Sequence, residues 1–212
     1  PFQALMANGR RFLIENTSIS YAPSLTALSA MTRPRMVRTT ASAELLALAN
    51  PLISSLTART VNSVYIDERL APLPEAERQV RLLAKLYGPT RSKIYIGPQA
   101  REDRVKTEAA GYPILHLAAH GIFNDNNPMY SQIVLSQGDE STNEVGMLEA
   151  WEIANLGLKT DSVVLSACET ARGRVGNGEG LIGLTWAFFV AGVPSTVARQ
   201  CQVESVSTSE LM

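Results

Sequence analysis

The chain has 212 residues, of which 45% are hydrophobic and 18% are charged, and its formal net charge is -1. This composition is typical of a globular protein, and the balanced charge gives no electrostatic reason to expect nucleic acid or a membrane surface as a partner. The apolar run at residues 181–193 is shorter than the ~18 residues that a membrane span needs, and it fits a buried helix better.

Two further features of the composition bear on the origin of the chain. The two cysteines, Cys168 and Cys201, are too few for a disulfide scaffold and are expected to be reduced thiols of a cytoplasmic protein. The chain starts with Pro1 rather than Met, so we expect it to be a piece of a longer protein.

The N-terminal third carries weak patterns. Residues 11–24 are predicted to form two short strands around a turn at 15–18, and residues 24–31 a short helix with Ser24 as its N-cap. Residues 32–40 are basic and without periodicity, which is typical of a solvated loop. Residues 43–51 are a buried strand or a short helix that Pro51 ends in either case.

From residue 74 onward, strand and helix patterns alternate. A helix is predicted at 74–88, with Val80, Leu83, Ala84 and Tyr87 on one face and Gly88 at its end. Further helices are predicted at 100–111 (polar), 146–157 and 180–192, and strands at 92–97, 113–119, 131–136, 161–167 and 194–199. The alternation, with strands that are apolar on both faces, predicts an α/β fold with a mostly parallel sheet covered on both sides.

The stretch "PILHLAAHGIF", residues 113–123, contains both histidines of the chain. On a helix, His116 and His120 would lie within ~6 Å and could share a zinc ion, but on a strand they are ~13 Å apart. The short apolar run favours a strand, and no cluster of Cys, His or carboxylates completes a site in the nearby sequence, so no metal is expected. His116 lies within the strand and is predicted to be structural, hydrogen-bonded and neutral.

His120 and Cys168 each follow the carboxyl end of a predicted strand, where ligands and catalysis usually lie in parallel α/β sheets. A thiol with a pKa of ~8.5 is mostly protonated at neutral pH, and a nearby imidazole makes it a useful nucleophile. If the two strands are neighbours, the two residues meet at one edge of the sheet. From residue types alone, a catalytic pair and two unrelated residues remain equally open.

The sequence "GEGLIG", residues 178–183, fits the G-x-G-x-x-G pattern of dinucleotide-binding loops. That pattern directly follows a strand, whereas here ten positions separate Gly178 from Cys168, and no GK[ST] follows that would indicate a P-loop. A glycine-rich loop that leads into a closely packed helix is the better interpretation. Glu179 could cap this helix or contact a substrate, and the capping role is favoured. No organic cofactor is expected.

Several segments together resemble the CHAT domain, a caspase-like cysteine peptidase domain that is related to separases. They are "HLAAHG", "SQIVLS", "VVLSACET" and "GEGLIGL", in this order, with "RFLIENTSISYAPSLTAL" upstream and "STSELM" at the end. The resemblance covers nearly the whole of residues 1–212 and implies one domain, a three-layer α/β/α caspase-like sandwich. It also implies that further C-terminal helices and an upstream repeat region belong to the longer protein.

The resemblance further implies a cysteine endopeptidase with a dyad of His120 and Cys168, which are 48 positions apart. The backbone N–H groups of Gly121 and Cys168 would hold the oxyanion, and no metal or cofactor is implied. The implied partners are a peptide or protein substrate and a tetratricopeptide-repeat region in the same or another chain. The alternative is a non-catalytic interaction module of the same fold.

This chain departs from the family at three places, and in one of them, residues 200–205, the sequence "QCQVES" stands where the family usually has a more apolar strand with a Trp. Ala119 stands where such domains usually have Thr before the "HG" pair. The sequence "SACET" differs from the caspase "QACRG", so a preference for aspartate in the substrate is not implied.

Overall fold

A computed structural model describes residues 5–7, 11–17, 24–31, 44–64, 70–138, 144–166 and 179–198. The chain divides into two compact units, Pro1–Met36 and Val37–Met212. The predicted loop at 32–40, Cys168, Gly178 and Cys201 lie outside the described residues. No helix among the described residues is long and apolar enough to cross a membrane.

The first unit contains a small strand pair and a helix. Strand β1 (Met6–Ala7) pairs antiparallel with β2 (Arg11–Phe12), which leads into the 3-10 helix η2 (Leu13–Glu15). The first predicted strand is confirmed only at Arg11–Phe12, and residues 18–23, where the second was predicted, lie outside the described residues. A side-chain oxygen of Glu15 accepts the N–H of Phe12 at 2.8 Å, and the chain curls into η2 where the first predicted strand was expected to continue. The predicted helix at 24–31 is confirmed as α1 (Leu25–Met31).

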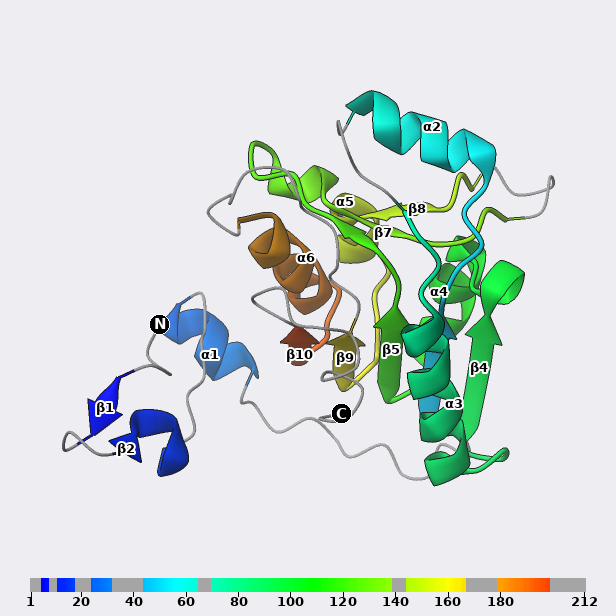
Figure 1. Ribbon diagram of the computed structural model, residues 1–212. Helices are drawn as coiled ribbons and strands as arrows, with labels where there is room; N and C mark the ends of the chain where they lie inside the picture. Colours follow the sequence, from blue (N-terminus) through cyan, green and yellow to red (C-terminus); the bar gives the residue numbers. More distant parts are fainter. Residues whose placement is uncertain are drawn as a thin grey trace. The chain divides into compact units, whose positions relative to one another are not determined.

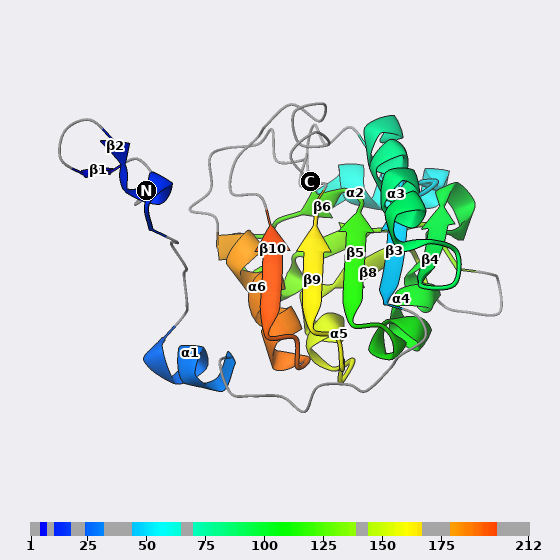
Figure 2. The ribbon, with the colours of Figure 1, turned by 90° about the horizontal axis from the view of Figure 1, so that it is seen from below.

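A parallel sheet of five strands forms the centre of the second unit. Its order is β10, β9, β5, β3, β4, and all neighbours are parallel (Figure 2). The strands are β3 (Leu45–Ala49), β4 (Ser92–Ile96), β5 (Ile114–Ala118), β9 (Ser162–Leu165) and β10 (Ser195–Ala198). The strands predicted at the last four of these places are confirmed, and of the two alternatives for residues 43–51 the structure has the strand, at Leu45–Ala49.

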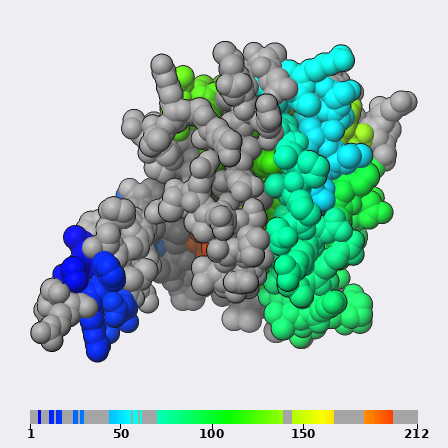
Figure 3. Space-filling view, in the orientation of Figure 1, coloured from blue at the N-terminus to red at the C-terminus, as the bar shows by residue number. Residues whose placement is uncertain are grey.

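Helices cover both faces of this sheet, as the apolar strand patterns predicted. Two hydrophobic core clusters lie on the two faces of the sheet, and alternate residues of β3 belong to different clusters. Leu46 and Leu48 belong to the larger cluster, and Leu45 and Ala47 belong to the smaller one, together with Val80 of α3. The larger cluster also contains residues of α4, α5 and α6. The helices are α3 (Pro74–Tyr87), α4 (Glu102–Glu108), α5 (Ala150–Ala154) and α6 (Glu179–Val190). The fold is thus an α/β/α sandwich, with α3 on the outer surface of one face (Figures 1 and 3).

A second, antiparallel sheet continues directly from β5. It contains β6 (Gly121–Ile122), β7 (Gln132–Val134) and β8 (Met147–Glu149), in that order. The strand predicted at 131–136 is confirmed as β7, but it lies in this sheet and not in the parallel one. The helix predicted at 146–157 begins only at Ala150, because pairing with β7 holds the preceding residues extended.

Helix α2 (Ser55–Val64) was not predicted. Its residue Val61 is buried against Ile122 and Val134, which belong to β6 and β7. Helix α2 therefore packs on the small sheet through Val61. The remaining short 3-10 helices are η3 (Gly97–Gln99), η4 (Ala109–Gly111) and η5 (Pro128–Tyr130).

The strand order identifies one place in the sheet where the chain changes direction. From β3 the chain moves outward to β4, and it then returns across β3 to β5 and continues to β9 and β10. In open α/β sheets, ligands bind outside the carboxyl ends of the strands at such a switch point. Here these are the carboxyl ends of β3 and β5, which lie at the same edge of the sheet (Figure 2).

We predict that Gly183→Ala destabilises the fold. A Cβ atom at Gly183 would lie 2.5 Å from the backbone oxygen of Pro128 in η5, so α6 and η5 would have to move apart. Forced overpacking of this kind costs about 1–3 kcal/mol. Urea unfolding measures the loss. Gly111→Ala is the control, because a Cβ there meets nothing within 4 Å and Gly111 has no positive φ; equal stability of the two variants would contradict the prediction.

Candidate active site

His120 lies just beyond the carboxyl end of β5, between this strand and β6, and only 3% of it is exposed. Its backbone is held, since the carbonyl oxygen accepts the N–H of Val134 at 2.8 Å. The histidine therefore lies at the switch point of the parallel sheet and at the start of the antiparallel one. This is the place that the sequence predicted for it.

The ring of His120 is oriented by a backbone carbonyl. Its Nε2 atom is 2.6 Å from the oxygen of Ala71. A carbonyl oxygen can only accept a hydrogen bond, so Nε2 carries the proton. In the neutral ring Nδ1 is then the basic nitrogen, which is the atom that could take a proton from a nucleophile.

The segment that provides this carbonyl is fixed on both sides of Ala71. Leu70 packs against the cluster of Val61, Ile122 and Val134, and the N–H of Leu73 is bound by the side chain of Asn50 at 2.7 Å. The sequence analysis missed both Ala71 and Asn50. A backbone carbonyl has no residue-type signal, and the end of β3 was explained by Pro51 alone.

The strand that precedes Cys168 is the neighbour of the strand that precedes His120. In the pairing of β5 with β9, Ile114 lies opposite Ser162 and Leu117 opposite Leu165, so partners are always 48 positions apart. The N–H of Ser166 also donates to the oxygen of Leu117 at 3.1 Å, which extends the ladder. The two strands are thus neighbours, which is the condition for the two residues to meet, and the meeting of the two side chains remains a prediction.

His116 is a buried residue of β5, with 3% exposure. Burial lowers the pKa of its ring to about 4, so the ring is neutral at neutral pH, as expected. The expected hydrogen bond is not made by Nε2, which has no partner among the described residues. Its register neighbours on β3 and β9 are Ala47 and Val164, and neither side chain offers a polar atom.

Gly121 is buried in β6, opposite Ile133 of β7. A Cβ atom at this position would lie 3.2 Å from Cζ of Phe123, so the aromatic ring occupies the space beside the glycine. A side chain at this position would therefore require the Phe123 ring to shift. The oxyanion role predicted for its N–H stays a prediction.

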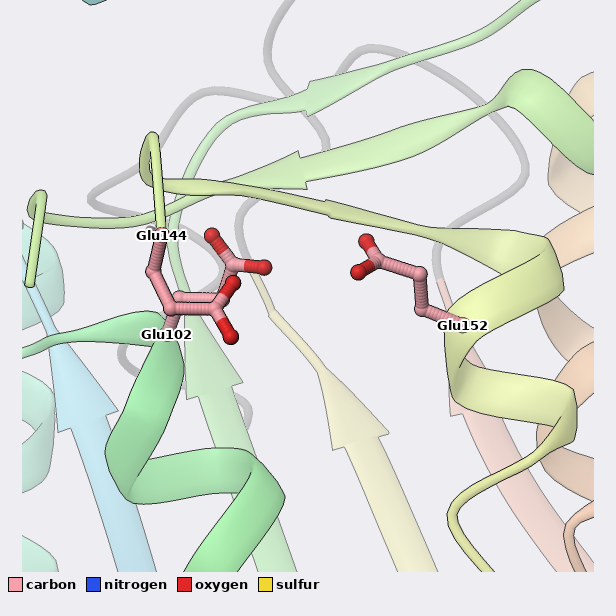
Figure 4. Close-up of side chains that lie close together, drawn as sticks. All are labelled: Glu102, Glu144 and Glu152. Carbon is pink, nitrogen blue, oxygen red and sulfur yellow. The ribbon is translucent and has the colours of Figure 1, made fainter. Parts of the chain in front are cut away.

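A second cluster of charged side chains contains Glu102 of α4, Glu144 and Glu152 of α5 (Figure 4). Carboxylates at such short separations could bind a cation, but the amine of Lys106 lies 2.7–2.8 Å from an oxygen of each. Lys106 thus supplies the positive charge that a metal ion would bring. The cluster is an internal ion network rather than a candidate metal site.

This network ties the small sheet to α4. Glu102 is 1% exposed, and its carboxylate also accepts the N–H groups of Gly146 and Met147 at 3.0 Å. Burial, helped by the neighbouring Glu144, raises the pKa of Glu102 to about 7. Burial alone would lower the pKa of Lys106, but its three carboxylate partners raise it above its usual value. The sequence predicted a polar helix here and missed that Glu102 faces inward.

The comparisons with known proteins identify the family. The family model described as "CHAT domain" matches residues 1–212, the whole chain. The chain belongs to the CHAT family. No match was found among curated proteins. The parallel sheet between helical layers is the architecture of this caspase-like, peptidase-related family, and the fold expected from the resemblance is confirmed.

We predict that His116 makes the CHAT fold less stable in acid. The ring binds a proton in the unfolded chain near pH 6.5 but in the folded chain only near pH 4, so stability is full above pH 6.5 and falls below it. The loss reaches about 3 kcal/mol by pH 4. Protonation of Glu102, whose pKa is raised to about 7, changes the stability in the opposite direction over an overlapping pH range. Because Glu102 is present in both proteins, the comparison of wild type with His116→Leu in urea unfolding at several pH values isolates the effect of His116. Parallel pH profiles of the two proteins would refute the prediction.

We also predict that Lys106→Met destabilises the protein, by about 3 kcal/mol or more. The substitution leaves three carboxylates around a largely buried site without their shared cation, and breaking a buried ion pair from one side is strongly unfavourable. Thermal and urea unfolding at pH 8 measure the effect. The control is Lys85→Met on the exposed side of α3, for which little change is expected; a similar loss in both variants would contradict a specific role of the network.

Proposed function

We propose that this CHAT domain is a cysteine endopeptidase in which His120 is the general base and Cys168 the nucleophile. The observation that carries the proposal is the register of β5 with β9. The constant offset of 48 positions along this pair equals the separation of His120 and Cys168 in the sequence. When two residues follow neighbouring parallel strands and have the same offset as the paired residues of those strands, both leave the sheet at the same edge.

The hydrogen bond of His120 suits this role. With Nε2–H donating to Ala71, Nδ1 of the neutral ring is the nitrogen that can receive a proton. A buried imidazole at the switch point would serve both as base and, after protonation, as acid. The family to which the chain belongs is peptidase-related, which agrees with this chemistry.

The reaction would proceed through a thioester. Nδ1 of His120 takes the proton of the Cys168 thiol, and the thiolate forms a bond to the carbonyl carbon of the substrate. As the C–N bond breaks, the imidazolium gives its proton to the leaving amine. Water, deprotonated by the same nitrogen, then attacks the thioester, and the thiol is released with its proton restored.

The N–H groups of Gly121 and Cys168 are proposed to hold the oxyanion during these steps, for which each donor typically contributes about 3 kcal/mol. The substrate would be a peptide or protein chain. A tetratricopeptide-repeat region, in the same or a partner chain, is the proposed regulator. No metal or organic cofactor takes part in this scheme.

We predict that iodoacetamide alkylates Cys168 at least about tenfold faster than Cys201 at pH 7. Lowering a thiol pKa from ~8.5 to ~7 raises the thiolate fraction by about that factor. His120→Asn should abolish the difference, whereas the control His116→Leu should keep it. The site of alkylation and its rate are measured by mass spectrometry of peptides from a time course.

Cleavage is then tested on a mixture of unstructured peptides, with Cys168→Ala as the inactive control. New N-termini that appear with wild type and not with this variant would support the peptidase. Equal alkylation rates of Cys168 and Cys201, unaffected by His120→Asn, would overturn the dyad and favour the non-catalytic interaction module.

A further inference from the structure

Asn50 has an unusual backbone conformation at the carboxyl end of β3. Its φ is +47°, and no other non-glycine residue among the described ranges has a positive φ. Asn tolerates this left-handed conformation better than most residues, although the conformation is still uncommon. The N–H of Asn50 donates to the oxygen of Ala118 at 3.1 Å, so this residue bridges β3 and β5 at the switch point of the sheet.

The side chain of Asn50 fixes the start of α3. Its Oδ1 accepts the N–H of Leu73 at 2.7 Å, and its Nδ2 donates to Glu77 at 3.2 Å. Leu73 lies between Pro72 and Pro74, neither of which has an N–H. The N–H of Leu73 is therefore the one backbone donor of this three-residue run, and Asn50 binds it.

The bound segment contains the carbonyl that orients His120. Ala71 lies two positions before Leu73, and Leu70 on its other side is packed in an apolar cluster. With both flanks held, the oxygen of Ala71 meets Nε2 of His120 at 2.6 Å. The two prolines further restrict the backbone between Ala71 and α3.

From these contacts we infer that Asn50 is a positioning residue of the site, which selects the tautomer of His120 by holding the carbonyl of Ala71 in place. The inference rests on the proposed dyad. If the segment 70–73 moved, Nε2 would lose its acceptor, and the proton could occupy Nδ1. Such a ring presents an N–H where the mechanism needs a lone pair.

Asn50→Gly is the variant that tests this, because glycine adopts a φ of +47° without strain and removes only the side chain. Long-range ¹H–¹⁵N NMR spectra of the ring nitrogens identify the tautomer of each histidine. The chain has two histidines, so the spectrum of His116→Leu assigns both sets of signals. The signals of His116 also report whether the sheet is intact.

In wild type we expect His120 in the Nε2–H form. In Asn50→Gly we expect a mixture of both tautomers, unchanged His116 signals, and alkylation of Cys168 that is slower by about tenfold, toward the rate in His120→Asn. Asn50→Asp with Glu77→Gln should restore both properties, because the carboxylate still accepts from Leu73 and the new amide donates back to it.

The two ways of failing can be told apart. An unchanged tautomer of His120 in Asn50→Gly overturns the inference, whatever the thiol does. If the tautomer changes but neither this variant nor His120→Asn alters the alkylation of Cys168, the proposed dyad is wrong, and Asn50 is then not a positioning residue of an active site. A change in the His116 signals together with those of His120, not reversed by the double variant, would indicate general disruption and also overturn the inference.

Discussion

The candidate site depends on the position of β5 between β3 and β9. One backbone hydrogen bond on each side continues the pairing past the ends of β3 and β9. The N–H of Asn50 donates to Ala118, and the N–H of Ser166 donates to Leu117. His120 thus leaves the sheet from a strand whose end is paired on both sides. A loop residue that must act with defined geometry needs such a rigid base, and here the base consists of backbone hydrogen bonds between buried strands.

The second support of His120 comes from the antiparallel sheet that follows it. The carbonyl of His120 accepts a bond from β7, and β7 also pairs with β8. The start of β8 is held in turn by Glu102, through the N–H groups of Gly146 and Met147. The ion network around Lys106 therefore acts on the site indirectly, by keeping in place the sheet to which the backbone of His120 is bonded.

The strand and helix periods were sufficient to predict the central sheet, because its strands are buried on both faces and read as apolar runs. They were insufficient for β8, whose residues have a helical pattern but are paired with β7, and for α2, whose buried Val61 packs against Ile122 and Val134 of the small sheet. The position of His120 after β5, and the strand before Cys168, followed from these same apolar strand patterns. Ala71 could not be predicted, since its contribution is a carbonyl, and Asn50 contributes through a contact with residues 23 and 27 positions away.

The two histidines, one within β5 and one just beyond it, have different surroundings although they are four positions apart. His116 lies within the sheet between Ala47 and Val164, where burial without a polar neighbour lowers its pKa to about 4. Such a ring is unsuited to accept a proton near neutral pH. His120 is equally buried, but it lies beyond the strand, where the chain between α2 and α3 can offer a carbonyl to one of its nitrogens. The two rings therefore differ in the acceptor that Ala71 provides to His120, and not in the extent of burial.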